Sequence, residues 1–274
     1  MKLTILAALV ACMPAGAQQP ARPAGFSEPD PIDFTDHSGW TSLFDGDSLK
    51  GWDGNKTIWR VENGAIVAES TCEKPTGTTY LIWQGGEAGD FELKAELRGE
   101  GAGINSGIQY HSFLNPPAAG RGTAGGGRGP AGACPSGQPR GTPDAAENAR
   151  WNVGGPQADF DGTNRYTGQY YEGGTSRGIV AYRGQVVHAE EGKKPRLLAN
   201  LGSREELGGY VRINDWNQIY IVARGRQMTH IVNGHVMSVF IDDDPARFRP
   251  KGLIALQIEG TGKVSFRNIW IKKE

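Results

Sequence analysis

The feature that most constrains the fold is a series of short segments in which apolar and polar residues alternate. Residues 91–98 and 104–111 both alternate in this way, which predicts strands with one buried face and one solvent-exposed face. Two Asn-Gly pairs, Asn63-Gly64 and Asn233-Gly234, stand between apolar segments and are the strongest short signal for a β-hairpin turn. A chain built this way is predicted to be all-β.

Further strand-like segments continue to the C-terminus, and helical patterns are short. The helical patterns cover residues 144–150 and 203–207, and the spacing of β-α-β units does not occur. Many short strands joined by turns favour an antiparallel sandwich or barrel. The other predicted strands are 59–62, 65–68, 80–83, 218–224, 228–232, 253–258 and 264–271.

The N-terminal residues have the pattern of a signal peptide. Lys2 precedes an apolar segment, and Ala15-Gly16-Ala17 resembles a cleavage site before Gln18, so residues 1–17 are predicted to be removed on export. We therefore expect a periplasmic or secreted protein. A lipobox-like sequence ending at Cys12 leaves lipid anchoring as the alternative, and no second apolar segment of spanning length follows.

The rest of the chain, residues 18–274, is interpreted as a flexible linker followed by one domain. Residues 18–38 are rich in Pro and Ala, which is typical of a linker. Within the domain, residues 114–148 are dominated by Gly, Pro and Ala and are predicted to form a loop insertion, either a lid or an insertion without a role. The net charge of −1 argues against a nucleic-acid partner.

Two cysteines, Cys72 and Cys134, remain in the predicted mature chain. An oxidising compartment permits a disulfide between them, but their spacing does not decide whether they pair. Few histidines lie near them, so a zinc site is not expected.

Residues 151–173 form the densest polar and aromatic segment. Gln157, Asp159 and Asp161 alternate with Ala158 and Phe160, so the three polar side chains are expected on one face of a strand. Acids, amides and phenols bind hydroxyl-rich ligands or hard metal ions. The alternative is a solvated strand face beside a polar hairpin.

Several segments, taken in order, resemble the 3-keto-disaccharide hydrolase domain family. The resemblance covers about Trp40 to Lys272 and rests on SLFDGDSLKGW, GDFELKAELR, NSGIQY, GGPQADFDGTNRYTGQYYE, WNQIYIVARGRQMTHIVNG, GLIALQ and VSFRNIWIK. It implies a concanavalin A-like antiparallel β-sandwich (a jelly roll) over residues 39–274, with a ligand groove on its concave face. It also implies cleavage of 3-keto-glycosides by elimination and hydration, and functional coupling to a sugar 3-dehydrogenase that makes the 3-keto sugar.

The chemistry of a 3-keto sugar specifies the groups that such a site needs. A ketone at C3 acidifies the proton on C2, because the carbanion is delocalised as an enolate, and the oxygen on C1 can then leave. The site needs a base near C2, an electrophile near the C3 oxygen and an acid for the leaving group. It does not need the carboxylate pair of an ordinary glycosidase.

The sequence offers candidate residues for these roles. Asp159 is the first choice for the base or for a metal ligand, with Asp161 or Glu172 as the second acid. The predicted catalytic residues are Asp159, Glu172, Arg165 and His230. The predicted substrate-binding residues are Trp83, Gln109, Tyr110, His111, Gln157, Asp161, Tyr166 and Gln257.

Glu259 marks a departure from the family, since many relatives carry a histidine at this strand position. A glutamate can bind a hard cation but is a poorer acid unless its pKa is raised. Asp159 and Glu259 are therefore the candidate ligands of a divalent cation. The alternatives to an enzyme are a lectin-like carbohydrate-binding module and a structural cell-envelope domain, and the sandwich fold serves all three.

Overall fold

The computed structural model describes residues 29–115, 134 and 141–274. The chain divides into two units, Met1–Ile32 and Asp33–Glu274, and the second contains the folded domain. The predicted signal peptide, Cys12 and most of the predicted insertion lie outside the described residues. No helix within the described ranges is long and apolar enough to span a bilayer.

The domain is built almost entirely of β-strands, with two short α-helices and one 3-10 helix at Ala149–Trp151. The helices are α1 (Ala145–Asn148) and α2 (Arg204–Gly208). The strands are β1 (Thr41–Ser42), β2 (Trp52–Asp53), β3 (Trp59–Glu62), β4 (Ala65–Ser70), β5 (Thr79–Trp83), β6 (Phe91–Leu114), β7 (Val153–Asp161), β8 (Tyr170–Gly173), β9 (Gly178–Ala181), β10 (Gln185–Glu190), β11 (Arg196–Asn200), β12 (Asn217–Arg224), β13 (Gln227–Val232), β14 (His235–Asp243) and β15 (Leu253–Lys273).

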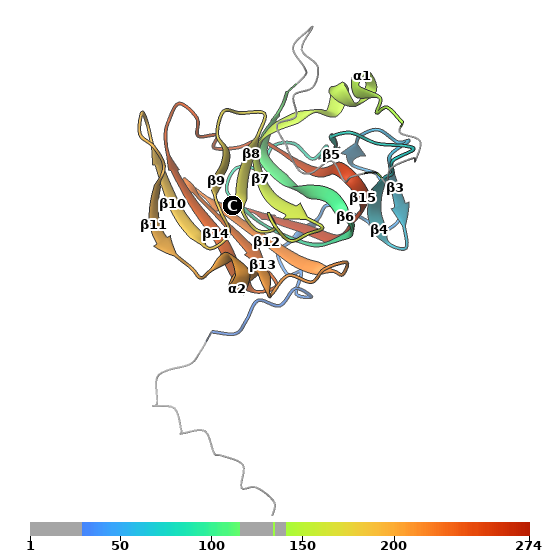
Figure 1. Cartoon of the computed structure of the whole chain (residues 1–274). Coiled ribbons are helices and arrows are strands. Elements are labelled where there is room, and N and C mark those ends of the chain that lie inside the picture. Colours follow the sequence, from blue (N-terminus) through green and yellow to red (C-terminus); the bar gives the residue numbers. More distant parts are fainter. Residues whose placement is uncertain (1–28, 116–133, 135–140) are drawn as a thin grey trace, which may run out of the picture. The chain divides into compact units, whose positions relative to one another are not determined.

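Two long strands, β6 and β15, pair with each other along nearly their whole length and belong to both layers of the sandwich (Figure 1). Residues 91–97 of β6 and residues 264–273 of β15 lie in the back layer. The other strands of that layer are β12, β13, β14, β10, β11, β4 and β3. Residues 105–114 of β6 and residues 253–259 of β15 lie in the front layer with β7, β8, β9, β5 and β2. The predicted antiparallel sandwich is therefore confirmed, with β10–β14 as a parallel pair.

The sequence predicted each long strand as two separate strands, and glycines explain why the strands continue. Gly101 has φ +104°, and Gly260 and Gly262 have φ +79° and +143°, values that residues with a Cβ rarely adopt. A Cβ on Gly260 would lie 2.1 Å from the carbonyl oxygen of Gly103. The two strands therefore bend together, in contact, and carry the sheet from one layer to the other.

The core lies between the layers and contains the apolar residues that the alternation predicted. Phe91, Leu93, Ala95 and Leu97 are buried there. Both Asn-Gly turns have positive φ at both residues, as a tight hairpin requires. Strands β9, β10 and β11 were not predicted, since their residues do not alternate cleanly.

The folded unit begins inside the segment predicted as a linker, because residues after Ile32 pack on the back layer. His37 stacks on Trp270 with ring centroids 3.8 Å apart. The ammonium of Lys94, a buried residue, donates to the backbone carbonyl of Asp36 and lies 4.6 Å from the ring centre of Trp40. These contacts order residues that composition alone assigns to a linker.

A disulfide joins Cys72 to Cys134 and so resolves the pairing that spacing left open. Beyond it, the chain returns along the loop between β4 and β5, where the amide of Gly141 donates to Cys72 O at 2.9 Å. The side chain of Asn148 bonds to Thr76 O at 2.7 Å and to Asn55 at 3.1 Å. The end of the insertion is therefore fastened to the front layer.

Candidate functional site

The outward face of the front layer carries a patch of polar side chains from five neighbouring strands, β5, β15, β6, β7 and β8. In register, Asp159 lies opposite Gly107, which lies opposite Gln257, which lies opposite Tyr80. The adjacent positions place Asn105 opposite Glu259, and Gln157 opposite Tyr171. We call this patch the polar face and define it as Tyr80, Asn105, Gln157, Asp159, Tyr171, Gln257 and Glu259.

A chain of amides crosses the polar face. Gln157 Nε2 donates to Gln257 Oε1 at 2.6 Å and to Ser106 O at 3.1 Å, and Gln257 Nε2 donates to Tyr80 Oη at 3.2 Å. The side chain of Gln157 passes over Gly107, where a Cβ would lie only 2.3 Å from Nε2. Glycine is therefore required at this position for the chain of amides to form.

Two carboxyl groups, Asp159 and Glu259, lie on either side of Gly107 and Asn105. Their strands are separated by β6, so their backbones lie two strand spacings apart, roughly 10 Å. Asn105 Nδ2 donates to Glu259 Oε2 at 3.2 Å, and Gln169 Nε2 donates to Asp159 Oδ2 at 2.7 Å. Each carboxyl group is thus oriented by an amide.

Burial raises the pKa of both carboxyl groups. The pKa of Asp159 is well above its ordinary value because the group is desolvated; the Gln169 hydrogen bond opposes this shift, and the charges of Asp161 and Glu259 add to it. The pKa of Glu259 is also raised by desolvation, against a hydrogen bond from Thr78. Because the charge of Glu259 disfavours the charged form of Asp159, the two groups can divide the roles of acid and base.

The phenol of Tyr171 is affected by the charges of both acids. Burial raises its pKa to about 12, and the charges of Asp159 and Glu259 contribute to the same shift. The phenol therefore keeps its proton at neutral pH and remains a hydrogen-bond donor.

Asp161 lies on the same strand face as Asp159, but its carboxylate binds the backbone of the loop between β7 and β8. Its carboxylate accepts hydrogen bonds from the backbone amides of Thr163, Arg165, Tyr166 and Thr167 at 2.6–3.2 Å. The side chain of Arg165 is exposed and lies 5.2 Å from the ring centre of Tyr166. Asp161, Arg165 and Tyr166 are therefore brought together in a loop rather than on the polar face.

Glu172 lies on the opposite side of β8 from Tyr171, because adjacent strand residues point to opposite faces. It is buried and bonds to Arg177 at 2.8 Å and to Tyr170 Oη at 3.1 Å. The structure thus places it in an ion-pair cluster between the layers and away from Asp159.

Tyr110 and His230 lie in the core. The Tyr110 hydroxyl is 2.8 Å from His230 Nε2, and His230 Nδ1 is 3.2 Å from Gln169 O. His111, also buried, has its Nε2 2.8 Å from Gly89 O. These three residues stabilise the interior and do not reach the polar face.

The lowered pKa of His230 leads us to expect that the stability of the fold depends on pH. Burial lowers this pKa from 6.5 to about 4, against hydrogen bonds to the carbonyls of Gln169 and Gly168. The unfolded chain therefore binds a proton that the folded chain does not between pH 6.5 and 4, so stability is lost as pH falls through this range. We expect a loss on the order of 3 kcal/mol from this group, measured by urea unfolding at pH 7 and pH 4.5.

His230→Gln provides the control for that prediction, since glutamine keeps a donor and an acceptor but does not titrate. The variant should show a weaker dependence of unfolding free energy on pH in this range. An unchanged dependence would mean that other groups cause it.

Gln109 and Trp83 are the remaining predicted residues. In the amide orientation that satisfies its neighbours, the side-chain nitrogen of Gln109 donates to Pro156 O at 2.8 Å and to Gly155 O at 3.2 Å. Gln109 therefore stabilises the bulge between β6 and β7. Trp83 packs against the core on the side of β5 opposite Tyr80, with the ammonium of Lys273 4.8 Å from its ring centre. Gln109 also hydrogen-bonds the Tyr80 phenol at the edge of the polar face, whereas the half-buried Trp83 lies on the other side of β5.

The structure adds three residues to the site that sequence reasoning did not select: Asn105, Tyr171 and Tyr80. Asn105 could have been found, because it alternates with Ile104 and Ser106 and so shares a face with Gly107. Tyr80 and Tyr171 depend on strand pairing, which the sequence did not specify.

The polar face offers few ligands for a resident metal ion. Asp159 and Glu259 supply two carboxyl groups, and no group of three or more histidine, cysteine or acidic side chains in the described part of the chain is arranged to hold a metal. Hard cations take six or more oxygen ligands, so these residues alone do not fit a resident metal.

Among the comparisons with known proteins, the family match is the one that links this chain to carbohydrate chemistry. The model of the 3-keto-alpha-glucoside-1,2-lyase-like domain matches residues 39–272. The search of curated proteins found no match.

Three of the solved structures that resemble this chain show how limited the similarity is. A presumed glycosyl hydrolase from Parabacteroides distasonis ATCC 8503 is 16% identical, with a TM-score of 0.49, over 86% of this chain and 99% of that chain. The carbohydrate-binding module CBM66 from Bacillus subtilis is 11% identical, with a TM-score of 0.44, over 80% and 93%. A β-glucanase from Bacillus licheniformis is 9% identical, with a TM-score of 0.44, over 86% and 98%. Identities this low do not bear on activity.

Proposed function

Because the chain belongs to the 3-keto-alpha-glucoside-1,2-lyase-like domain family, we propose that it is an enzyme that cleaves 3-keto-glycosides. The observation that supports this most is the pair of acids on the polar face. Both have raised pKa values, and the charges acting on Asp159 are those of two other acids. An acid of raised pKa beside a carboxylate is the combination that proton abstraction and leaving-group protonation require.

We assign Glu259 as the base and Asp159 as the acid, the reverse of the role that the sequence suggested for Asp159. Both acids accept a hydrogen bond from an amide, but Asp159 is the more strongly desolvated group and lies near the charges of two other acids, so its charged form is the less favoured of the two. In the elimination, the C2 proton passes to Glu259, the C1–O bond breaks, and Asp159 protonates the departing oxygen. The product is a 3-keto-2-hydroxy-glucal.

Hydration reverses these proton transfers. Water adds its hydroxyl to C1, its proton passes to Asp159, and Glu259 returns a proton to C2, which releases the free 3-keto sugar. The donor suited to the developing charge on the C3 oxygen is the phenol of Tyr171, which keeps its proton at neutral pH. Both acids thus end the cycle in their starting states.

The test is incubation of the mature chain with a 3-keto-glucoside that carries a chromogenic leaving group, with and without a chelator. Release of the chromophore together with the glucal or free 3-keto sugar supports the enzyme. Binding without release favours the lectin-like module instead. Loss of release with chelator would require a metal that the described side chains alone do not hold.

We also propose that the protein acts after export, in the periplasm or outside the cell. The disulfide Cys72–Cys134 supports this, since such bonds persist in oxidising compartments. The ketone at C3 must be introduced by a dehydrogenase that oxidises a sugar hydroxyl, and functional coupling to such an enzyme is part of the proposal.

A further inference from the structure

One edge of the back layer is open. Strand β11 is the last strand of that layer and pairs with β10 on one side, and no strand in the described part of the chain pairs with its other side (Figure 1). An open edge presents backbone N–H and C=O groups to another chain, and proteins usually protect it with charged side chains, prolines, bulges or a covering segment. The side chains at each edge of the layer therefore show which edge can accept a partner.

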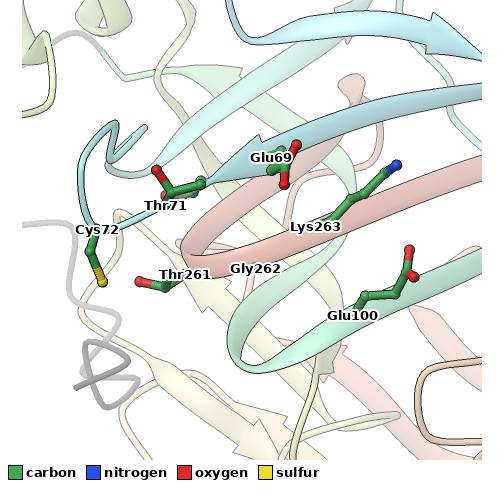
Figure 2. A pocket seen from close by; sticks show the side chains of 8 residues that line it. Glu69, Thr71, Cys72, Glu100, Thr261, Gly262 and Lys263 are labelled. Carbon is green, nitrogen blue, oxygen red and sulfur yellow. The ribbon is translucent and has the colours of Figure 1, made fainter. Parts of the chain in front are cut away.

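The opposite edge of the back layer, at β3 and β4, is protected by charge. Arg60 lies 2.5 Å from Glu62 and 3.4 Å from Glu69, and Lys263 lies 2.8 Å from Glu62. Figure 2 shows Glu69, Glu100 and Lys263 around a surface depression beside this edge. A protein surface docked here would have to desolvate these charges, which is costly.

The edge at β11 is apolar instead. Six of the eight large apolar side chains that are exposed in the described part of the chain lie between residues 182 and 213. Leu197 and Leu198 are 52% and 50% exposed. The amide of Leu201 donates to Gly184 O at 2.8 Å, which places Leu201 beside the turn that carries Tyr182. We call Tyr182, Leu197, Leu198 and Leu201 the edge patch.

The cations next to the edge patch do not cover it. Arg196 begins β11, and its Nη2 lies 3.1 Å from Glu190, the last residue of β10. Lys193, in the turn, lies 3.0 Å from the same carboxylate. Both cations are thus held by Glu190, and the leucines that follow Arg196 remain exposed.

Leu198 is the residue of the edge patch with the greatest freedom to contact another chain. The register between β10 and β11 shifts at this position, so Leu198 has no partner residue on β10. A bulge bends the strand and interrupts its ladder. Contact with another chain must therefore come mainly from side chains packed against the edge, and less from a continuous row of backbone hydrogen bonds.

A second copy of this chain is complementary to the edge patch. The formal net charge is −1, so two copies repel each other only weakly. A two-fold axis beside Leu198 would set the two β11 edges antiparallel, as a closed dimer interface requires. Leu197 and Leu198 would then meet the same residues of the second copy, and Arg196 would lie opposite Asn200, so no like charges would face each other.

The two flanks of β11 have opposite charge, which favours the same arrangement. Lys194 precedes the strand and Glu205 follows it, both are exposed, and neither forms an ion pair with another described residue. Antiparallel edges bring the flank before one strand toward the flank after the other. Lys194 would therefore approach the second copy's Glu205, and the two-fold axis would repeat this contact.

The exposed surface is large enough for such an interface. A specific interface takes about 20–30 residues from each partner. Residues 191–206 are all exposed, apart from the half-buried Gly202, and the exposed Tyr182 lies beside them. This is close to the lower end of that range, so a dimer of moderate affinity is expected.

We propose that the edge patch is the interface of a two-fold dimer of this chain, in which two copies pack β11 against β11. The dimer leaves the polar face open, because β11 belongs to the back layer and the polar face lies on the outward side of the front layer. The proposal is therefore independent of the proposed function.

Sedimentation of the full mature chain in the analytical ultracentrifuge should give twice the mass of one chain. Leu198→Lys should raise the dissociation constant roughly 100-fold or more, because each dimer loses two leucine contacts and brings two ammonium groups together. The matched control is Leu114→Lys, which changes a leucine that is 56% exposed on β6 and should leave the dimer intact. Circular dichroism should be the same for all three proteins.

A cross-link tests the position of the interface. Cys72 and Cys134 are joined, so Leu198→Cys adds a single free thiol to the chain from Gln18 onward. Oxidation should link two copies of this variant covalently, and should not link Leu114→Cys at the same concentration. A wild-type chain that stays monomeric up to its solubility limit, or a dimer that Leu198→Lys does not weaken, would overturn the proposal. Species larger than a dimer would indicate a head-to-tail contact between different edges and would overturn it as well.

Discussion

Glu259→Gln is expected to lower kcat/KM for every 3-keto-glycoside by roughly 10²- to 10⁴-fold, the usual contribution of a positioned base. The C2 proton must be removed whatever the leaving group is, so the loss should be similar for a nitrophenyl glycoside and for a disaccharide. Glutamine preserves the size of the side chain and can still accept the hydrogen bond from Asn105 Nδ2. Circular dichroism and the unfolding midpoint should therefore be close to those of the wild type.

Asp159→Asn should give a different pattern, because a leaving-group acid matters least when the leaving group is already stable. We expect a loss of similar size with a disaccharide, and a much smaller loss with a nitrophenyl leaving group. Equal losses for both substrates would reverse the two assignments. Glu191→Gln, a change at an exposed position, is the control and should leave both rates unchanged.

The pH dependence provides a second readout of the same pair. Activity requires Glu259 charged and Asp159 protonated. The raised pKa of Glu259 places the acidic limb above the ordinary range of a glutamate, and the raised pKa of Asp159 places the alkaline limb far above that of an aspartate. The two limbs belong to the coupled pair. Glu259→Gln should abolish the acidic limb in whatever activity remains.

The fold could be predicted because its signals are local. Alternation in residues 91–98 and the turn at Asn63-Gly64 report burial and backbone geometry within a few residues. The bends at Gly101 and Gly260 could not be predicted in this way, because they depend on two strands that touch at their glycines. For the same reason the sequence did not predict that β6 and β15 each continue through both layers.

Which of the candidate residues share a strand face could be predicted where parity within one strand was sufficient. Gln157 and Asp159 share a face by alternation, and Gln257 and Glu259 do the same on β15. Tyr110 was assigned to the site although it is adjacent to Gln109 and therefore points to the other side of β6. His230 was assigned by residue type, and only the strand pairing shows that its neighbours are the core residues Tyr110 and Tyr170.

Glu172 was also selected by residue type, although its strand position turns it away from the polar face. Its ion pair with Arg177 gives the prediction with the largest effect on stability. Arg177 is buried among three acids, with Nη1 2.8 Å from Glu172 and 2.6 Å from Asp242, and Nη2 3.4 Å from Asp244. Burial alone would lower the pKa of Arg177, but the hydrogen bonds to Asp242 and Glu172 raise it above its ordinary value. This guanidinium joins β8 and its following turn to β14.

Arg177→Met should reduce the free energy of unfolding by roughly 3–5 kcal/mol, because it leaves buried carboxylates without their partner. Urea unfolding at pH 7 measures the loss. Arg165→Met, at an exposed arginine, should change the same free energy by less than about 0.5 kcal/mol. Adding Glu172→Gln and Asp242→Asn to Arg177→Met should recover much of the loss, because the unpaired charges are then removed. If Arg177→Met alone cost under about 1 kcal/mol, the acids would have to be solvated rather than buried.

Since Tyr171 is adjacent to Glu172 on β8, a destabilised cluster would also disturb the polar face. The value of kcat should therefore fall together with stability in the single variant and recover in the triple variant.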